Sequence, residues 1–374
     1  MPTTTSQTTG RLRYAATGCL LMAWDARPVI ARAPVRISFG GGGTDLPAYY
    51  ERFGGFVVSA AIARYCYAIA GPSVDGSVGV NSADYRCWER WSAGEAPALT
   101  GPLSLPMAVV GWFAEQGLLD RGVEVFTSSE VAPGSGLGSS SAMMVALIHA
   151  LAAYTDRAME PAEVAALASH LEIDLLRRPI GKQDQYASAF GGINAITFDV
   201  DGVKVDQITL APGMADGLRD RLLLFSTGQT RDSATILDHQ RAATVSDAAV
   251  TARLDRMKEL AYEMRDALTG GDLDRFGSLL DDGWRLKRGL RGVSSNSIDR
   301  WYDAARGAGA LGGKIAGAGG GGFLLLFCPP RSRQAVRERM AALNLRELVF
   351  DFDDAGAHVM NEPLVSATPV LAGF

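Results

Sequence analysis

The sequence has few of the residues that usually cross-link a chain or hold a metal. Its 374 residues include four cysteines and four histidines, all scattered, and no cysteines have C-x-x-C spacing. Scattered cysteines of this kind are typical of free thiols in a reducing compartment. The scarcity of histidine argues against a histidine-based metal site. We therefore expect a cytoplasmic protein without disulfide bonds.

Long apolar runs and an excess of basic charge are also missing. No segment has about 18 or more uninterrupted apolar residues, which a membrane-spanning helix would need. The net charge of −5 gives no indication of a nucleic-acid-binding face. With 47% hydrophobic and 21% charged residues, the composition is that of an ordinary globular protein. We therefore expect neither a nucleic acid nor a membrane as partner.

Residues 1–28 are predicted to form an N-terminal extension. The first ten residues are rich in threonine and indicate disorder, and the arginines that follow precede a short apolar run, as in a weak signal peptide. Thr17 and Gly18 interrupt that run, and no clean small-x-small cleavage site follows. We interpret this segment as a surface extension, or as the product of a start codon placed upstream of a true start near Met22.

A glycine- and serine-rich stretch lies between a predicted strand, 123–126, and an apolar helical pattern, 142–148. A strand, a glycine loop and a helix start gather backbone N–H groups where the helix dipole attracts phosphate. Glycine lets the backbone approach a ligand, and a serine can cap the helix or offer its hydroxyl to a phosphate-bound metal. The predicted phosphate-binding residues are Pro133, Gly134, Ser135, Gly136, Leu137, Gly138, Ser139, Ser140 and Ser141.

Two common phosphate loops do not match this stretch. No lysine follows its last glycine, as the G-x-x-x-x-G-K-[ST] pattern requires. Glu163 lies near the place of the acidic partner in the dinucleotide fingerprint, but the triple serine is foreign to that motif. A flexible glycine-serine linker is the structural alternative, and it is disfavoured because both flanking segments are strongly patterned.

Two further glycine clusters flank predicted strands. Residues 40–43 are four consecutive glycines after a predicted strand, and Thr44 and Asp45 are the first polar side chains beyond them. Asp45 can accept hydrogen bonds from sugar hydroxyls or cap the helical turn that follows. Residues 312–322 form the third cluster and run into a buried-strand pattern. We expect this cluster to pack beside the loop of residues 133–141.

Two acidic residues stand out in the middle of the chain. Glu172 lies among apolar residues of a helix predicted over 161–177, where a carboxylate is costly unless it is paired or bound to a cation. A metal ion and a salt bridge to Arg177 or Arg178 are the two solutions. Asp184 lies in a polar cluster after that helix and is either a catalytic carboxylate or a plain turn residue.

The coarse pattern predicts two domains of mixed structure. Strands and helices alternate along the chain, which favours an α/β or α+β fold. We place the domains at 29–208 and 209–374, after a predicted strand pair over 193–210. The remaining expected elements are strands at 29–38, 56–70, 73–91, 222–226 and 348–353, a polar loop at 227–232, and helices at 105–119, 245–268, 272–290, 297–307 and 333–343.

In this order, the three glycine clusters resemble those of the GHMP kinases, the superfamily of galactokinase, homoserine kinase, mevalonate kinase and phosphomevalonate kinase. The resemblance runs from about residue 32 to the C-terminus. Residues 33–47, 181–186 and 312–323 are similar to the D-glycero-D-manno-heptose 7-phosphate kinase branch. Val35 stands where the common pattern has glycine, which fits this branch.

The resemblance implies an α+β fold, a ribosomal-protein-S5-like N-terminal domain and a ferredoxin-like C-terminal domain, with the active site between them. It implies ATP and Mg²⁺ as cofactors, with Ser140 and Glu172 at the metal. Asp184 matches the catalytic aspartate and Arg36 the basic residue of the first motif. The protein is expected as a monomer or homodimer. The expected substrate-binding residues are Gly41, Gly42, Gly43, Thr44, Asp45, Lys182, Gln183, Arg231, Gly319 and Gly320.

The implied function is phosphorylation of the anomeric C1 hydroxyl of a heptose 7-phosphate or a related higher-sugar phosphate, such as an octose phosphate. Kinases for fucose or glucuronate share the motifs, and a diphosphomevalonate-decarboxylase type and a non-catalytic binding protein are more distant alternatives. A phosphorylated sugar needs basic residues in the cleft. Arg231, Lys287, Arg288 and Lys314 are candidates, each expected as a surface charge when taken alone, with Arg231 preferred.

Overall fold

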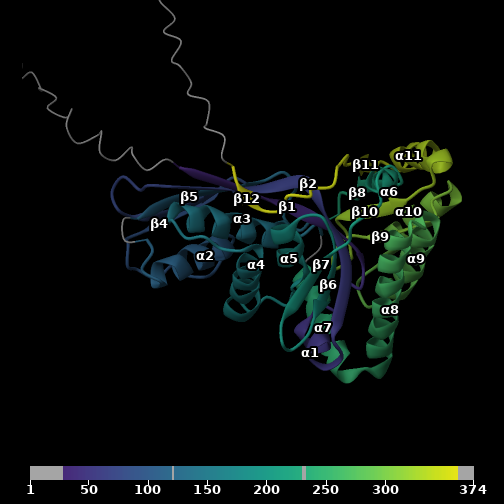
Figure 1. Ribbon diagram of the computed structural model, residues 1–374, viewed down its shortest axis with the longest axis horizontal. Helices are drawn as coiled ribbons and strands as arrows, with labels where there is room; N and C mark the ends of the chain where they lie inside the picture. Colours follow the sequence, from purple (N-terminus) through teal and green to yellow (C-terminus); the bar gives the residue numbers. More distant parts are fainter. Residues whose placement is uncertain (1–27, 120–121, 230–232, 361–374) are drawn as a thin grey trace, which may run out of the picture.

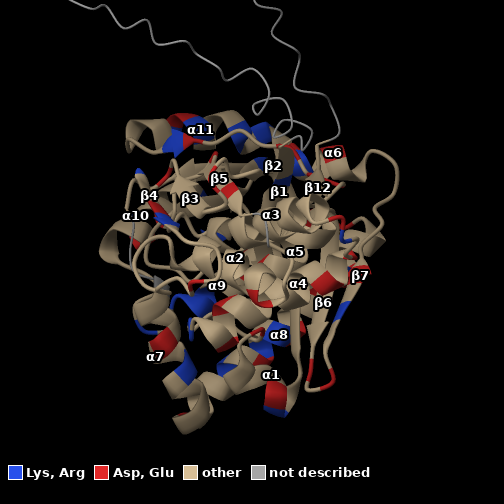
Figure 2. Ribbon diagram, turned by 90° about the vertical axis from the view of Figure 1, so that its left-hand side faces the viewer, with Lys and Arg blue, Asp and Glu red and all other residues tan. Residues whose placement is uncertain are grey.

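The computed structural model describes residues 28–119, 122–229 and 233–360 (Figure 1). The predictions for residues 1–27 and for Arg231 lie outside these described residues. None of the described helices combines the length and the apolar composition that a membrane crossing requires. Cys66, Cys87 and Cys328 are free thiols, as predicted. Acidic and basic residues are interspersed over the helices in Figure 2.

The larger of two sheets is organised around one long strand. β2 (Gly55–Gly71) has 17 residues and pairs with β1 (Val29–Gly40) along one edge. On its other edge its first part pairs with β6 (Ile193–Phe198) and its last part with β5 (Val123–Ser129). The described part of this sheet has eight strands and is completed by β3 (Val78–Ser82), β4 (Cys87–Trp91), β7 (Val203–Gln207) and β12 (His358–Val359).

Helices cover one face of this sheet, beneath it in Figure 1. The central helix, α3 (Ser139–Tyr154), is rich in alanine and is buried along most of its length, so it can lie close to β1 and β2. The other helices of this layer are α2 (Ser104–Glu115), α4 (Pro161–Ser169) and α5 (Gln183–Phe190), and the short α1 (Pro47–Phe53) follows the first glycine cluster.

The helix predicted over 161–177 is not a single α-helix. α4 ends at Ser169, and the chain continues as a π-helical turn, His170–Leu175. Glu163 completes a capping box at the start of α4, which sets the beginning of the helix. The π-helical turn carries Glu172 and turns its fully buried side chain toward α3. Helical periodicity alone does not reveal such a turn, because it depends on tertiary contacts.

The smaller sheet has the ferredoxin-like order β11-β8-β10-β9, all antiparallel. Its strands are joined in the sequence β-α-β-β-α-β, which confirms the expected α+β architecture. The strands are β8 (Leu222–Ser226), β9 (Gly312–Ile315), β10 (Phe323–Phe327) and β11 (Arg346–Glu347), and the helices are α6 (Met214–Arg219), α7 (Ser233–Ser246), α8 (Ala248–Gly270), α9 (Leu273–Lys287), α10 (Asn296–Gly307) and α11 (Arg333–Ala342).

The structure of this half of the chain differs from the sequence prediction at one strand and contains further elements. The strand predicted at 348–353 is absent, and Phe352 only forms an isolated bridge with Ile62. α7 occupies a stretch for which no element was predicted. Residues 312–315, which belong to the third glycine cluster, form β9. Glycine is required there by packing on α9, because a Cβ at Gly312 would lie 2.1 Å from the Gly277 carbonyl oxygen.

Aromatic side chains join the two sheets into a continuous core. Phe276 of α9 packs edge-to-face against Phe39 of β1, with ring centroids 5.2 Å apart, and lies 5.8 Å from the Phe327 ring of β10. All three rings are buried. β12 also returns the chain to the larger sheet after the smaller one is complete. The domain division at residue 208 stays a prediction.

We predict that Phe276→Ala lowers the free energy of unfolding by about 3–5 kcal/mol, because it removes a buried ring and leaves a cavity between the sheets. Chemical denaturation followed by fluorescence measures the change. Phe53→Ala is the matched control. Because Phe53 is 38% exposed, this substitution should lower the free energy of unfolding far less. Equal losses in the two variants would contradict the role given to Phe276.

Candidate active site

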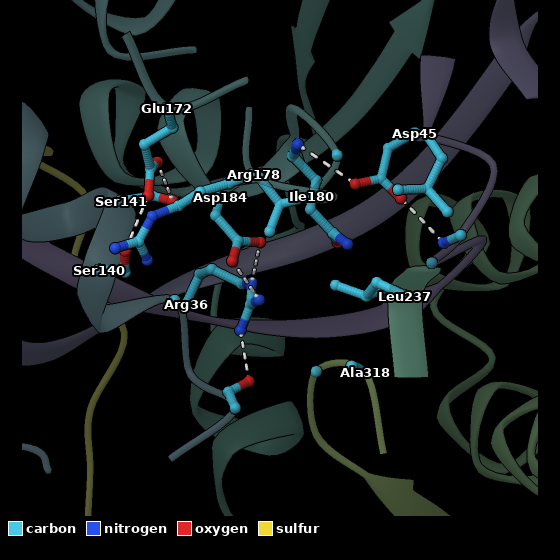
Figure 3. Close-up of a pocket in the computed structure, with 18 of the residues that line it drawn as sticks. Arg36, Asp45, Ser140, Ser141, Glu172, Arg178, Ile180, Asp184, Leu237 and Ala318 are labelled. Atoms are coloured by element: carbon cyan, nitrogen blue, oxygen red, sulfur yellow. Dashed lines mark hydrogen bonds and ion pairs between the residues drawn. The ribbon is translucent and has the colours of Figure 1, made fainter. Parts of the chain in front are cut away.

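A cavity brings the three glycine clusters together with α5, α7 and the end of α9 (Figure 3). The segments that line it are far apart in the sequence. β1 leads into the first cluster, β5 into the second, and β9 and β10 flank the third. The lining residues are Arg36, Gly42, Gly43, Asp45, Leu46, Gly134, Gly136, Gly138, Ser139, Ser140, Ser141, Glu172, Arg178, Ile180, Gly181, Gln183, Asp184, Leu237, Gln240, Lys287, Gly317 and Ala318.

The loop before α3 has the backbone that its glycines predict. Gly134, Gly136 and Gly138 have φ angles of 75°, 79° and 78°, in the left-handed region that favours glycine. Gly138 is the N-cap of α3, so the loop ends where the first N–H groups of the helix are free. Such a helix start is suited to bind an anion.

The third glycine cluster packs directly on this loop, as predicted. A Cβ at Gly136 would lie 2.7 Å from the Ala316 carbonyl oxygen, and one at Gly322 would lie 2.2 Å from the Ser135 carbonyl oxygen. Both distances are too short for any side chain. The close approach of the two backbones therefore depends on glycine in both segments.

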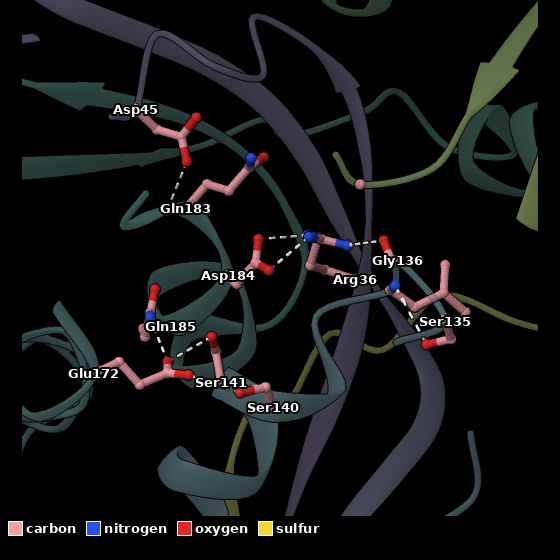
Figure 4. Close-up of polar contacts among 12 residues, drawn as sticks. Arg36, Asp45, Ser135, Gly136, Ser140, Ser141, Glu172, Gln183, Asp184 and Gln185 are labelled. Atoms are coloured by element: carbon pink, nitrogen blue, oxygen red, sulfur yellow. Dashed lines mark hydrogen bonds and ion pairs between the residues drawn. The ribbon is translucent and has the colours of Figure 1, made fainter. Parts of the chain in front are cut away.

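Arg36 and Asp184 form a partly buried ion pair against the loop (Figure 4). The Arg36 guanidinium donates from Nε to Asp184 Oδ1 at 2.7 Å and from Nη2 to Oδ2 at 2.6 Å. Its Nη1 donates to the Gly136 carbonyl oxygen at 2.7 Å. The Asp184 side chain is 21% exposed and that of Arg36 only 4%, so the carboxylate is the partner that a bound molecule can reach. The pair holds Asp184 in one orientation at the cavity wall.

Glu172 is fully buried and is held by the loop serines. Its carboxylate accepts hydrogen bonds from the hydroxyls of Ser140 and Ser141, each at 2.7 Å, and from Gln185 Nε2 at 2.6 Å. Burial raises the pKa of the Glu172 carboxyl, and the three hydrogen bonds oppose that shift. Glu172 forms no ion pair with Arg177 or Arg178, so the salt bridge considered from the sequence is not present.

Asp45 is buried where the first glycine cluster ends. Its carboxylate accepts hydrogen bonds from the backbone N–H groups of Gly43, at 2.8 Å, and Gln183, at 3.4 Å. Burial raises the pKa of Asp45, the hydrogen bond from Gly43 lowers it, and the charge of Asp184 raises it. Asp45 does not cap the following helix, because the N-cap of α1 is Leu46. The capping alternative is therefore wrong.

Two of the candidate cations are buried, contrary to the expectation for surface charges. Lys287 Nζ donates to the Gly317 carbonyl oxygen at 2.6 Å and lines the cavity. Lys314 Nζ donates to the Ser38 carbonyl oxygen at 2.7 Å, outside the lining. Both residues are 5% exposed, whereas Arg288 is exposed. Burial lowers the pKa of Lys287 to about 8, while the charge of Asp45 raises it and that of Arg36 lowers it.

Most of the predicted site residues line the cavity, and the others lie outside its lining. Among the latter, the hydroxyl of Thr44 bonds to the carbonyl oxygens of Gly41 and Phe56. The ammonium of Lys182 lies 5.0 Å from the centre of the Tyr50 ring. The predicted residues that lie outside the lining are Gly41, Thr44, Pro133, Ser135, Leu137, Lys182, Gly319 and Gly320. The roles assigned to individual residues stay predictions.

Several lining residues were not predicted as site residues from the sequence. Leu237 and Gln240 belong to α7, whose position was not predicted. Ile180 and Ala318 are apolar and carry no motif of their own. Only the third glycine cluster pointed to the neighbourhood of Ala318.

Comparison with known proteins decides the family. Residues 104–192 match the family described as GHMP kinases N terminal domain, and residues 264–344 match GHMP kinases C terminal. A D-glycero-alpha-D-manno-heptose 7-phosphate kinase from Campylobacter jejuni is 30% identical over 313 residues, which cover 82% of this chain and 91% of that protein. The chain belongs to the GHMP kinase family. It is therefore a phosphotransferase, and GHMP kinases use ATP.

This GHMP kinase is also similar to proteins with other sugar substrates in their names, by structure or by sequence. A solved D-glycero-D-manno-heptose 1-phosphate kinase from Bacteroides thetaiotaomicron has a TM-score of 0.75 and 27% identity, covering 90% of this chain and 99% of that one. Lactococcus lactis galactokinase, at 19% identity and a TM-score of 0.72 over 90% of this chain and 95% of that one, shares the fold alone. A bifunctional fucokinase/GDP-fucose pyrophosphorylase from Arabidopsis thaliana is 26% identical, covering 82% of this chain but 30% of that protein.

The lowered pKa of Lys287 predicts a pH dependence of stability. Lysine in the unfolded chain has a pKa of about 10.4, and the folded value is about 8. Between these two pKa values the unfolded state binds more protons than the folded state. The titration of Lys287 therefore increases the free energy of unfolding as pH rises, with a slope of up to ~1.4 kcal/mol per pH unit. Below pH 8 Lys287 stays protonated in the folded protein, so this increase in the free energy of unfolding is absent.

Lys287→Met should remove this contribution. Denaturant unfolding of the wild type and the variant at pH 7, 8, 9 and 10 measures it. The stability of the wild type relative to the variant should increase across pH 8–10. Parallel curves over this range would show that Lys287 does not titrate as the structure indicates.

Proposed function

We propose that this GHMP kinase transfers a phosphoryl group from ATP to the anomeric C1 hydroxyl of a heptose 7-phosphate or a closely related higher-sugar phosphate. One observation carries the proposal. The loop of residues 133–141, the Glu172 carboxylate and the Asp184 carboxylate line the same cavity, although they come from three separate parts of the sequence. Phosphoryl transfer requires this combination of an anion cradle, a metal ligand and a group that orients the acceptor.

The donor set at Glu172 fits Mg²⁺. Magnesium in kinases is usually held by one or two carboxylates together with phosphate oxygens and water. Glu172 supplies a carboxylate and Ser140 a hydroxyl, 2.7 Å from each other. The described residues contain no group of three acidic, histidine or cysteine side chains that would hold a metal alone. Bound Mg²⁺ supplies charge neutralisation on the phosphates.

The loop and its surroundings fit a nucleotide. Its three left-handed glycines and the start of α3 present backbone N–H groups to phosphate oxygens. A neighbouring, more apolar hollow begins at the same loop, because Gly134, Ser139 and Ser140 line both spaces. Leu105 and Met143 contribute its apolar wall. We assign this hollow to the base and sugar of ATP, and the other side of the loop to the acceptor.

Asp184 is the proposed base. Its carboxylate is exposed toward the cavity, while Arg36 fixes both of its oxygens and also bonds to the loop. A carboxylate held in this way orients the acceptor hydroxyl and takes its proton as the phosphoryl group is transferred. Arg36 adds a positive charge next to the reacting groups, where charge develops in the transition state.

The acceptor side contains groups that bind hydroxyls. Asp45, Gln183 and Lys287 line the part of the cavity near the first glycine cluster. Gln183 Oε1 is buried and has no partner among the described residues, so it can accept from a ligand. The heptose kinases among the relatives support a heptose phosphate, and the fucokinases support the alternative of an unphosphorylated sugar. A non-catalytic role is disfavoured because Glu172 and Asp184 are both in place.

We predict that Asp184→Asn lowers kcat by about two orders of magnitude or more, because the amide cannot accept the proton. Affinity for ATP, measured by calorimetry, should change little. Asp174→Asn is the control, since Asp174 is exposed and pairs only with His170. Unchanged turnover in Asp184→Asn would remove this residue from the mechanism.

A panel of sugars with ATP and Mg²⁺, followed by ADP release, tests the proposed substrate. The panel contains a heptose 7-phosphate, the unphosphorylated heptose, fucose and glucuronate. The heptose 7-phosphate should give the highest kcat/KM, and phosphorus NMR should place the new phosphate on C1. Turnover of fucose or glucuronate alone would favour the alternative, and release of CO₂ from diphosphomevalonate would indicate the decarboxylase type.

A further inference from the structure

A second hollow lies beside the catalytic cavity, on the other side of α7. Its volume is about 350 Å³, and it is bounded by α7, the first turns of α8 and the segment that follows α9. Gln240 lines both this hollow and the catalytic cavity, so the two spaces meet at this side chain. The segment after α9 also supports the third glycine cluster, because Gly320 N–H donates to the Val293 carbonyl oxygen at 2.8 Å.

The hollow has a surplus of positive charge without partners. Arg253 and Arg291 line it, and Asp247 is its one acidic lining residue. The Asp247 carboxylate is occupied, because it caps α8 by accepting from Ala249 N–H at 2.8 Å. Neither Arg253 nor Arg291 forms an ion pair or a hydrogen bond with any residue that the structure describes. Two free guanidinium groups in one hollow are suited to bind a phosphate.

Arg253 is held in place by packing. It is half-buried, and a Cβ at Gly289 would lie 2.5 Å from its Nη1, so the guanidinium rests on the glycine backbone. A larger residue at position 289 would displace it. The Arg253 guanidinium therefore lies against the wall of the hollow that Gly289 forms.

Gln240 is an unused hydrogen-bond donor between the two spaces. The residue is 7% exposed, and its Nε2 is buried with no partner in the described structure. The same atom lies against the first glycine cluster, since a Cβ at Gly43 would be 2.2 Å from it. A buried amide without a partner is costly, and a bound polar ligand would satisfy it.

Two of the three described cations that line the catalytic cavity are engaged by the protein. Arg36 is bound to Asp184 and to Gly136, and Lys287 donates to the Gly317 carbonyl oxygen. The third, Arg178, also lines the hollow assigned to the base and sugar of ATP, so it lies on the nucleotide side. Asp45, Glu172 and Asp184 add negative charge there. A phosphate group that the sugar already carries is therefore bound more favourably outside this cavity.

We propose that the second hollow is the subsite for the phosphate that the sugar substrate already carries, with Arg253 and Arg291 as its ligands and Gln240 as a donor to the sugar between the two spaces. The inference rests on the proposed function and adds the part of the chain that selects a phosphorylated sugar. The shared wall at Gln240 favours the substrate over a separate phosphorylated effector, because one molecule can reach both spaces.

Arg253→Gln and Arg291→Gln, singly and together, test the subsite. Each should raise KM for the heptose 7-phosphate by about tenfold or more, as loss of a charge-assisted hydrogen bond does. The values of kcat and of KM for ATP should stay within about twofold, since neither residue lines the catalytic cavity. Turnover of the unphosphorylated heptose should be unaffected. Arg256→Gln is the control, because Arg256 is on the same helix but pairs with Glu259 and Glu263.

The outcomes separate this inference from the proposed function. If the double variant keeps the preference of the wild type for the phosphorylated heptose, the subsite assignment is wrong while the kinase activity stands. If the wild type turns over no sugar, the proposed function fails, and calorimetry with the heptose 7-phosphate in the absence of ATP still tests the subsite. Binding that is weakened in Arg291→Gln supports it, and equal binding overturns it. Arg291 is exposed, so this variant should fold.

Discussion

The forked hydrogen bonding of Arg36 fixes the geometry on which the catalytic cavity depends. One guanidinium joins three elements, because it extends from β1, binds both oxygens of Asp184 on α5, and donates to the carbonyl oxygen of Gly136 in the loop before α3. The backbone N–H of Arg36 also donates to the Leu137 carbonyl oxygen at 2.9 Å. Breaking a buried pair leaves an uncompensated charge, so loop and carboxylate keep a common position.

Backbone contacts between glycines complete this arrangement. The loop from the N-terminal half and the third cluster from the C-terminal half approach at Gly136 and Gly317 more closely than side chains permit. Lys287 Nζ donates to the Gly317 carbonyl oxygen, which places the ammonium group at the edge of the cavity. The loop and the third glycine cluster are therefore parts of one packed unit, which also contains the contact between the Phe39 and Phe276 rings.

The sequence predicted the features that are encoded locally. The glycine loop, the adjoining α3 and the buried carboxylate of Glu172 follow from short patterns, and resemblance to the GHMP kinases connected them. Features set by packing between distant segments were not predictable in this way. Burial of Lys287 depends on the third glycine cluster, and the partners of Glu172 come from α3 and α5. α7 has neither a strong apolar face nor a motif, so Gln240 was missed.

Because Glu172 lies in the π-helical turn His170–Leu175, the place of its side chain depends on the number of residues in that turn as well as on the residue type. A π-helical turn accommodates one residue more than an α-helical turn, and each residue of an α-helix rotates the next by about 100°. Removing a single residue there would restore regular winding and swing the carboxylate away from the serines, even with every other side chain unchanged. A deletion in this helix would therefore misplace Glu172 without changing the residue type of any group that lines the cavity.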